Sequence, residues 1–402
     1  MTKASKEGQR KAPILRFKGF TDAWEQRQLR EISSSTIGGG TPKSSNKKFW
    51  NGNIPWIQSS DLVNGDIWNI TIKKHITLDA VENSAAKIIS ANSIAVVTRV
   101  AVGKLVYMPL EYATSQDFIS FQNLSGDHSF FMYLVSKVMH KVKGSLQGTS
   151  IKGISKGELL KKKVIYTLNI KEQKKIGTLL KSLDTILTLY ERKLKLLSQA
   201  KKYFLDNLFA GKEYPNLRFK EFTDAWEQRK LGKVATFING RAYKQNELLD
   251  SGKYKVLRVG NFYTNDSWYY SNLELADKYY IDKGDLVYTW SATFGPHIWN
   301  GEKVIYHYHI WKIELSKFLD RYFTLQILEA DKAKLLANTN GSTMIHVTKK
   351  GMESKVISLP TIEEQKQIGL YLTEFDTLIA LYENKKQNLI EIKKSLLNTM
   401  FI

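Results

Sequence analysis

One segment of this sequence occurs twice. Residues 16–29 (RFKGFTDAWEQRQL) return as residues 218–231 (RFKEFTDAWEQRKL), and only Gly19/Glu221 and Gln28/Lys230 differ between the two. Solenoid repeats are about 20–50 residues long, far shorter than the spacing of these two segments. The 402-residue chain is therefore predicted to contain two copies of one domain-sized module.

A second pair of matching segments closes each copy. Residues 172–191 begin EQKKIG and residues 364–383 begin EQKQIG, and apolar residues then follow at alternating steps of four and three. This spacing is typical of the a/d seam of a coiled coil. The seam positions are Ile176, Leu180, Leu183, Leu187, Tyr190, Leu194, Leu197, Phe204 and Leu208 in one copy, and Ile368, Leu372, Phe375, Ile379, Tyr382, Leu389, Leu396 and Met400 in the other.

The start of each helix is marked by a capping pattern. Thr361 with Glu364 predicts a capping box, and Asn169 with Glu172 predicts its asparagine variant. Lys201 and Lys393 interrupt the apolar seam at corresponding places in the two copies. Because each module precedes the N-terminal end of its helix, an antiparallel pair would hold the modules apart around an approximate two-fold axis. The helix register would then set the distance between the modules.

The remaining residues of each copy predict a globular module. Residues 30–125 and 232–315 contain short β-rich runs separated by Gly, Asn and Ser, and a helical stretch follows each of them. We therefore predict an α+β fold class: two tandem α+β domains separated by two long helices that pair as an antiparallel, pseudo-two-fold coiled coil. The predicted segments are a polar tail 1–13, a first module 14–158, a first long helix 159–212, a second module 213–348 and a second long helix 349–402.

The charge of the chain predicts a polyanionic partner. Sixty Lys and Arg oppose 39 Asp and Glu, for a net charge of +21, and nucleic acid is the commonest partner of so basic a protein. The absence of cysteine excludes disulfides, thiolate metal sites and a cysteine nucleophile. The polar N-terminus lacks a secretory signal, and no apolar run approaches the ~20 residues of a membrane span. We expect a cytoplasmic protein without a membrane partner.

Motifs for catalysis are missing from the sequence. There is no Asn/Asp-Pro-Pro-aromatic motif of an amino-methyltransferase and no GxxxxGK[ST] loop for ATP. Glu364 and Lys366 form an Glu-x-Lys pattern found in some nucleases, but their place in the first turn of a helix favours a capping role. A metal site formed by His297, His307 and His309 is one possible interpretation. Their aromatic neighbours instead favour a packed or DNA-facing strand. The residues favour a binding protein over a catalyst.

The order of these motifs resembles that of a known family. The duplicated FTDAWEQR-L opening, the stretch GGGTPKS…FWNGNIPWIQSSDL at 38–62 and the two EQ--IG--L---D helices are similar to the DNA-specificity subunit of type I restriction–modification enzymes. The resemblance extends from Arg16 to Phe401. The second module departs from it, since NGRAYKQ at 239–245 stands in place of GGGTPKS.

The resemblance implies a role within a larger complex. In that family each module is a target recognition domain that binds one half of a split, asymmetric site in double-stranded DNA. The helices set the gap and dock two methyltransferase subunits, which use S-adenosylmethionine to methylate adenine N6. Motor-nuclease subunits join for cleavage and use ATP and Mg²⁺. The specificity subunit itself is non-catalytic and holds no cofactor or metal.

The internal repeat suggests which residues contact bases. Equivalent positions that are polar yet different in the two modules are candidates for different half-site specificity. Aligning 93–103 with 285–295 and 56–62 with 256–262 selects such pairs, and Arg, Gln and Asn side chains suit guanine or adenine edges. The candidates are Lys43, Gln58, Asp61, Thr98, Arg99, Lys104, Ser145, Gln147, Thr149 and Lys152 in the first module, and Arg241, Tyr243, Arg258, Asn261, Trp290, Ser291, Asn340, Ser342 and Thr343 in the second.

Two other functions remain open at this point. A basic coiled-coil adaptor could bind RNA or another polyanion without sequence specificity. A self-contained restriction–methylation enzyme is disfavoured by the missing motifs. The duplicated Trp24 and Trp226 are predicted to be structural, because identical residues cannot distinguish two different half-sites.

Overall fold

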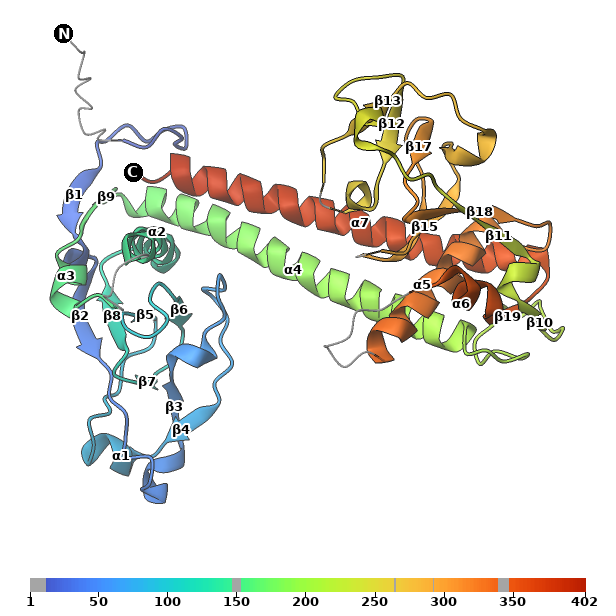
Figure 1. The fold of residues 1–402 in the computed structure, drawn as a ribbon. Coiled ribbons are helices and arrows are strands. Elements are labelled where there is room, and N and C mark those ends of the chain that lie inside the picture. The colour runs from blue at the N-terminus through green and yellow to red at the C-terminus, as the bar shows by residue number, and fades with distance from the viewer. Residues whose placement is uncertain (1–11, 147–152, 264, 292, 339–346) are drawn as a thin grey trace, which may run out of the picture. The chain divides into compact units, whose positions relative to one another are not determined.

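The computed structural model describes residues 12–146, 153–263, 265–291, 293–338 and 347–402. The chain divides into two compact units (Figure 1). The first unit comprises Met1–Tyr190 with Lys385–Ile402, and the second comprises Glu191–Asn384. Each unit therefore contains one module together with a part of both long helices, rather than a module separated from helical segments.

The first unit is built from three small sheets and three helices besides the long ones. Its four-stranded sheet has the order β2-β8-β5-β6, its three-stranded sheet the order β4-β3-β7, and β1 pairs with β9. The elements are β1 (Glu25–Gln28), η1 (Leu29–Ile32), β2 (Ser33–Gly38), η2 (Lys47–Phe49), β3 (Trp50–Ile57), η3 (Ser59–Asp61), β4 (Lys74–Ile76), α1 (Leu78–Glu82), β5 (Ser93–Val97), β6 (Leu105–Met108), β7 (Ala113–Thr114), β8 (Phe118–Leu124), α2 (His128–Leu146), α3 (Lys156–Leu160) and β9 (Lys163–Tyr166).

The second unit repeats this plan. Its sheets have the orders β11-β18-β15-β16 and β13-β12-β17-β14, and β10 pairs with β19. The elements are β10 (Glu227–Lys230), η4 (Leu231–Lys233), β11 (Ala235–Asn239), η5 (Gln245–Glu247), β12 (Tyr254–Leu257), η6 (Val259–Phe262), β13 (Tyr269–Ser271), η7 (Asp277–Tyr279), β14 (Tyr280–Ile281), β15 (Leu286–Thr289), β16 (Gly295–Ile298), β17 (Val304–Tyr306), β18 (Ile310–Leu315), α5 (Arg321–Asn338), α6 (Lys349–Ser354) and β19 (Val356–Leu359).

The two modules share one topology. The pair β3·β7 is parallel, as is β12·β17, whereas the sheets β2-β8-β5-β6 and β11-β18-β15-β16 are antiparallel throughout. The α+β prediction for both copies is thereby confirmed. The duplicated tryptophans lie in the cores, with Trp24 exposing 2% and Trp226 1% of their surface.

Two long helices, α4 (Ile170–Leu208) and α7 (Ile362–Thr399), run antiparallel in both units. In the first unit Asp184, near the start of α4, contacts Lys393, near the end of α7. In the second unit Lys201, near the end of α4, contacts Asp376, near the start of α7. The two lysines that interrupt the apolar seam thus pair with an aspartate of the opposite helix.

Both helices are shorter than the sequence suggested. The ranges 159–212 and 349–402 begin with other structure, because α3 ends at Leu160 and α6 spans Lys349–Ser354, and strands β9 and β19 follow them. These strands pair with β1 and β10, so each module is closed before its long helix starts. Hydrogen bonding to a distant strand outweighs the local helical pattern there.

The glutamate that opens each long helix forms a buried ion pair. Glu172 accepts two hydrogen bonds from the Arg16 guanidinium, at 2.5 and 2.9 Å, and Glu364 accepts two from Arg218, at 2.8 and 2.7 Å. Both carboxylates are fully buried. Asn169 and Thr361 do cap the backbone N–H of these glutamates. The predicted capping boxes are therefore only half correct, since the glutamate side chains bind the repeated arginine instead.

The glutamine and the glycine of the repeated EQK-IG segment join the long helix to the helix of its own module. Gln173 accepts a hydrogen bond from the Asp127 N–H at 2.8 Å, and Gln365 accepts one from the Asp320 N–H at 2.9 Å. A Cβ atom on Gly177 would lie 2.7 Å from the backbone nitrogen of Phe130, at the start of α2. Only glycine permits this close approach of α4 to α2.

Candidate nucleic-acid interface

The junction after β3 and β12 has the same geometry in both modules. The Asp61 carboxylate accepts a hydrogen bond from the Gln58 N–H at 3.0 Å, and the Asn261 side chain accepts one from the Arg258 N–H, also at 3.0 Å. The structure therefore supports the pairing of Gln58 with Arg258 and of Asp61 with Asn261. Each pair occupies one position of a common scaffold with different side chains.

Two of these four residues serve mainly to shape their own loop. Asp61 is 4% exposed, and its other oxygen lies 3.9 Å from the ammonium group of Lys73. The Asn261 amide donates to the carbonyls of Asn265 and Ser267, at 3.0 and 2.9 Å. Each side chain thus makes a hydrogen bond within its own loop, although the second Asp61 oxygen is buried without a hydrogen-bond partner among the described residues. The side chain of Gln58 is instead half-buried at the surface.

The arginines of the second module are also held by internal partners. Arg241 donates to both Glu247 oxygens, at 2.9 and 2.7 Å, which holds the pKa of Glu247 down at about 2. The same guanidinium lies 5.1 Å from the ring of Tyr243, whose hydroxyl donates to the Tyr306 carbonyl at 3.4 Å. Arg258 lies 4.2 Å above the ring of Tyr269. This stacking fixes its orientation.

The end of β5 corresponds to the end of β15. The Thr98 N–H donates to the Asp117 carbonyl at 2.8 Å, and the Trp290 N–H donates to the His309 carbonyl at 3.1 Å, so these residues are structurally equivalent. The Thr98 hydroxyl is buried and donates to the same carbonyl at 3.1 Å. The Trp290 indole N–H donates to the Tyr308 carbonyl at 3.0 Å.

The following hairpin turn differs in length between the modules. Val97 donates to the Lys104 carbonyl across its turn, whereas Thr289 pairs with Gly295. Lys104 therefore corresponds to Gly295, and the ungapped alignment with Pro296 is wrong by one residue. The Lys104 ammonium donates to the Leu62 carbonyl at 2.7 Å, so this lysine links the hairpin to the loop after β3.

Three segments of the first module meet at the end of β5. Lys104 connects the β5–β6 turn with the loop after β3, and the Ile154 N–H donates to the Thr98 carbonyl at 2.9 Å. Residues 153–155, which follow the loop after α2, thus lie beside the end of β5. Arg99 and Lys43 are exposed on the module surface, and Ser145, near the end of α2, donates to the Val142 carbonyl at 2.8 Å.

The loops after α2 and α5 contain the rest of the candidates. Gln147, Thr149, Lys152, Asn340, Ser342 and Thr343 lie outside the described residues.

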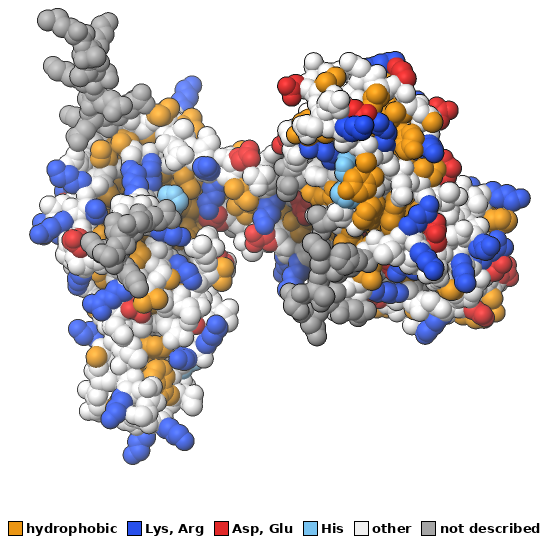
Figure 2. All heavy atoms as spheres, in the orientation of Figure 1, with side chains coloured by type: hydrophobic (Ala, Val, Ile, Leu, Met, Phe, Trp, Pro, Cys, Tyr) orange, Lys and Arg blue, Asp and Glu red, His pale blue; other side chains and the backbone are white. Residues whose placement is uncertain are grey.

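The second module adds aromatic contacts whose members, apart from Trp290, the repeat comparison did not select. His297 stacks on Phe262 with ring centres 4.3 Å apart, and Trp290 makes an edge contact with His309 at 5.0 Å. Figure 2 shows apolar side chains gathered beside histidines on this unit. Burial lowers the pKa of His297 to about 4, so the ring is uncharged at neutral pH. The pattern HYH at 307–309 was visible in the sequence, but its partners come from distant strands.

The described residues contain neither a metal-ligand cluster nor a membrane-spanning helix. In that part of the chain no group of three or more His, Cys, Asp or Glu side chains is arranged to hold a metal ion. None of its helices is long and apolar enough to cross a membrane.

Comparison with curated proteins finds relatives of the same kind. The chain is 27% identical over 248 residues to the type I restriction enzyme MjaIX specificity subunit of Methanocaldococcus jannaschii, covering 59% of this chain and 57% of that protein. It is 30% identical over 213 residues to the EcoR124I/EcoR124II specificity subunit of Escherichia coli, covering 49% of this chain and 50% of that protein. The matches thus span little more than half the length of these relatives.

Solved structures share the fold across the whole chain. The S subunit of the type I restriction–modification system from M. genitalium matches with a TM-score of 0.65 at 15% identity, over 97% of this chain and 99% of that one. A chain from a study of complex assembly and conformational transition of the type I R-M system matches with a TM-score of 0.53 at 14% identity, over 93% and 96%.

The sequence model of one family matches each half of the chain separately. It is described as the type I restriction modification DNA specificity domain, and it matches residues 21–199 and 223–391. Each match runs from the repeated Trp24 or Trp226 region through most of a long helix, as the duplicated modules require. Two matches that together cover most of the chain show that this protein belongs to the DNA-specificity subunits of type I restriction–modification systems.

Proposed function

We propose that each module binds one half of a split, asymmetric DNA site. The observation that carries this proposal is the pairing of different side chains at equivalent positions of one scaffold: Gln58 with Arg258, and Thr98 with Trp290. Two copies of one fold that present different surfaces suit two different half-sites. The net charge of +21 suits the phosphate backbone.

Within this proposal the candidate residues have two roles. Asp61, Thr98, Lys104, Asn261 and Arg241 shape the loops, because their polar groups bond within the fold. Exposed or half-buried side chains at the same loops make the contacts with DNA. These are Lys43, Gln58, Arg99, Ser145, Tyr243, Arg258, Trp290 and Ser291, together with the loop residues that follow α2 and α5.

The complex that this function requires contains further subunits. We propose that two methyltransferase subunits dock on the specificity subunit and methylate adenine N6 with S-adenosylmethionine. Motor-nuclease subunits that use ATP and Mg²⁺ would join them for cleavage, in the cytoplasm of the cell. The antiparallel helix pair would set the gap between the half-sites and give the assembly its approximate two-fold symmetry.

A module exchange tests the bipartite recognition. Replacing residues 33–154, from the start of β2 to the residue before the α3 cap, with the same part of a relative is expected to change only one half of the methylated motif. The β1·β9 pair and the Arg16–Glu172 ion pair remain intact in this exchange. Methylation sequencing of cells that carry the complex gives the motif. A change in both halves would contradict independent recognition by the modules.

The isolated chain is expected to be catalytically inert. Purified without partners, it should transfer no labelled methyl group from S-adenosylmethionine to DNA and should not cut DNA with ATP and Mg²⁺. Methyl transfer by the chain alone would overturn the non-catalytic assignment.

Binding measurements on the assembled complex separate this proposal from a nonspecific polyanion adaptor. Equal affinity of the assembled complex for RNA and for any duplex would favour the adaptor.

A further inference from the structure

A groove of the first unit lies between α2 and β9. Four lysines line it: Lys137 and Lys141 on α2, and Lys162 and Lys163 at the start of β9. The other lining residues have uncharged side chains, and none of the described lining side chains is acidic. Ile402, the last residue of the sequence, also lines the groove. The nearby Glu158 carboxylate lies outside the lining and accepts hydrogen bonds from the Ser155 hydroxyl and N–H, at 2.6 and 3.0 Å.

The four ammonium groups differ in burial and in hydrogen bonding. Lys137 donates to the backbone carbonyls of Phe401 and Leu397, at 2.8 and 3.3 Å. Burial, and then the charge of Lys141, lowers the pKa of Lys137 to about 8. Lys141, Lys162 and Lys163 are exposed. Within the described part of the chain, their ammonium groups form no ion pair and no hydrogen bond.

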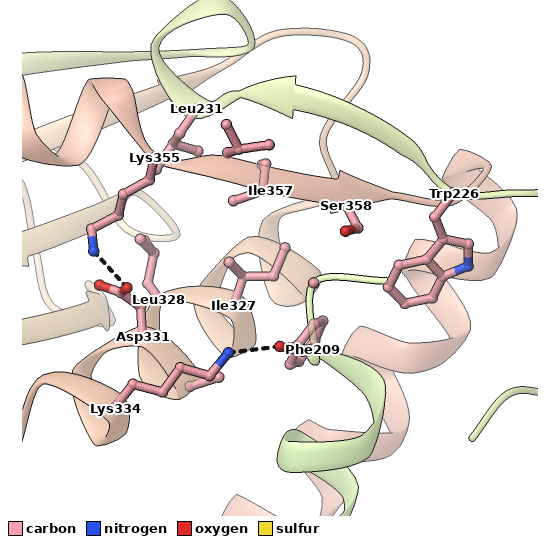
Figure 3. A pocket seen from close by; sticks show the side chains of 13 residues that line it. Phe209, Trp226, Leu231, Ile327, Leu328, Asp331, Lys334, Lys355, Ile357 and Ser358 are labelled. Carbon is pink, nitrogen blue, oxygen red and sulfur yellow. Dashed lines mark hydrogen bonds and ion pairs between the residues drawn. The ribbon is translucent and has the colours of Figure 1, made fainter. Parts of the chain in front are cut away.

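The second unit has the corresponding groove between α5 and β19 (Figure 3). The correspondence is fixed by two sets of hydrogen bonds. Phe130 and Phe323 donate to the capping aspartates Asp127 and Asp320, which aligns α2 with α5. Leu29 and Leu231 donate to the carbonyls of Lys162 and Lys355, which aligns the two strands. Val138 thus corresponds to Asp331, Lys141 to Lys334, and Lys163 to Val356.

Both lysines of this second groove have partners within the fold. Asp331 lies 2.6 Å from the ammonium group of Lys355, and Lys334 donates to the Phe209 carbonyl at 2.7 Å, as the dashed lines in Figure 3 show. The first groove has Val138 in place of the aspartate and two additional lysines, Lys137 and Lys163, where the second unit has Ala330 and Val356. The duplicated fold therefore carries a free cluster of positive charge in one copy only.

We propose that this groove of the first unit binds phosphate groups of the DNA backbone. The inference rests on the proposed function and extends it to a second contact surface. Ser145 lines the groove and is one of the residues proposed to contact DNA, so the groove shares a residue with the face that would contact the half-site. Lysine ammonium groups suit phosphates as point charges and carry no base specificity. The two half-sites would then be bound with unequal electrostatic contributions.

The salt dependence of DNA binding by the assembled methyltransferase complex tests this inference. Each phosphate contact contributes about 0.9 to the slope of log Kobs against log salt concentration. The variant K141Q/K162Q/K163Q is expected to make this slope shallower by about 2–3 and to leave the methylated motif unchanged. V138D is expected to act in the same direction, because the new carboxylate can pair with Lys162 as Asp331 does with Lys355. V138N controls for the change in packing.

Further variants separate the possible outcomes. K18Q/K220Q/K233Q removes the same charge from exposed positions outside the groove and should leave the slope nearly unchanged. D331V/V356K removes the aspartate of the second groove and adds one of the two lysines that it lacks, and should steepen the slope.

If both groove variants bind DNA specifically with the wild-type slope, the phosphate-binding role of the groove is wrong, whereas the proposed function still stands. An unchanged slope with impaired assembly would assign the groove to an acidic protein segment instead. Absence of specific binding by the wild-type complex would overturn the proposed function as well.

Discussion

Glu364→Ala is expected to lower the free energy of unfolding of the second unit by about 3–5 kcal/mol, because it leaves a buried charge without its partner. The carboxylate of Glu364 is fully buried, and it binds both the Arg218 guanidinium and the Trp226 indole N–H, the latter at 3.3 Å. Removing it leaves three N–H donors without this acceptor, two on Arg218 and one on Trp226. Urea unfolding of the full chain gives the stability, and hydrogen exchange shows whether the loss is confined to the second unit.

The control for this substitution is an exposed ion pair of the same unit. Glu227 lies 2.8 Å from Arg229, with 62% and 31% of their side chains exposed. Glu227→Ala should cost less than about 1 kcal/mol, as exposed pairs do. Glu172→Ala should reproduce the large effect in the first unit, where Arg16 is the partner. Equal small losses for Glu364→Ala and Glu227→Ala would contradict a structural role of the buried pair.

A four-residue insertion in both long helices, after Leu194 and after Tyr382, is expected to lengthen the unspecified gap by about one or two base pairs. Four helical residues add about 6 Å, against ~3.4 Å per base pair. Both helices must be extended, because the lysine–aspartate pairs lie at residues 184 and 201 of α4 and at 376 and 393 of α7, the same 17-residue separation. The measurement is the methylated motif in cells.

Insertions that disturb the pairing of the two helices should not give a working protein. Four residues in α4 alone would put one of the two pairs, Asp184–Lys393 or Lys201–Asp376, out of register. One residue in each helix would rotate every later seam residue by about 100° away from its partner. Both variants should lose DNA binding or stability. An unchanged gap after the matched four-residue insertions would mean that the helices do not set the spacing.

The sequence alone sufficed for the features that depend on local periodicity. Apolar residues at steps of three and four predicted both long helices, and the duplicated opening predicted two modules of one fold. The pairing of Gln58 with Arg258, and of Thr98 with Trp290, also followed from aligning the repeats. Such features are predictable because helix periodicity depends on residues close in sequence, and internal homology is visible as repeated residues.

The roles of the polar side chains depended on contacts between distant segments. Arg16 and Glu172 are 156 residues apart, and no local pattern shows that the glutamate binds this arginine rather than capping its own helix. Asp61, Lys104 and Arg241 were equally plausible as DNA contacts until their partners within the fold were known. Lys162 lies in a basic sequence, as Lys355 does, yet only Lys355 meets an aspartate on the neighbouring helix. The modules and the helices could thus be predicted from the residues alone. Which charges lack a partner is known only from the folded chain, because the free energy of a charge depends on the groups that folding brings near it.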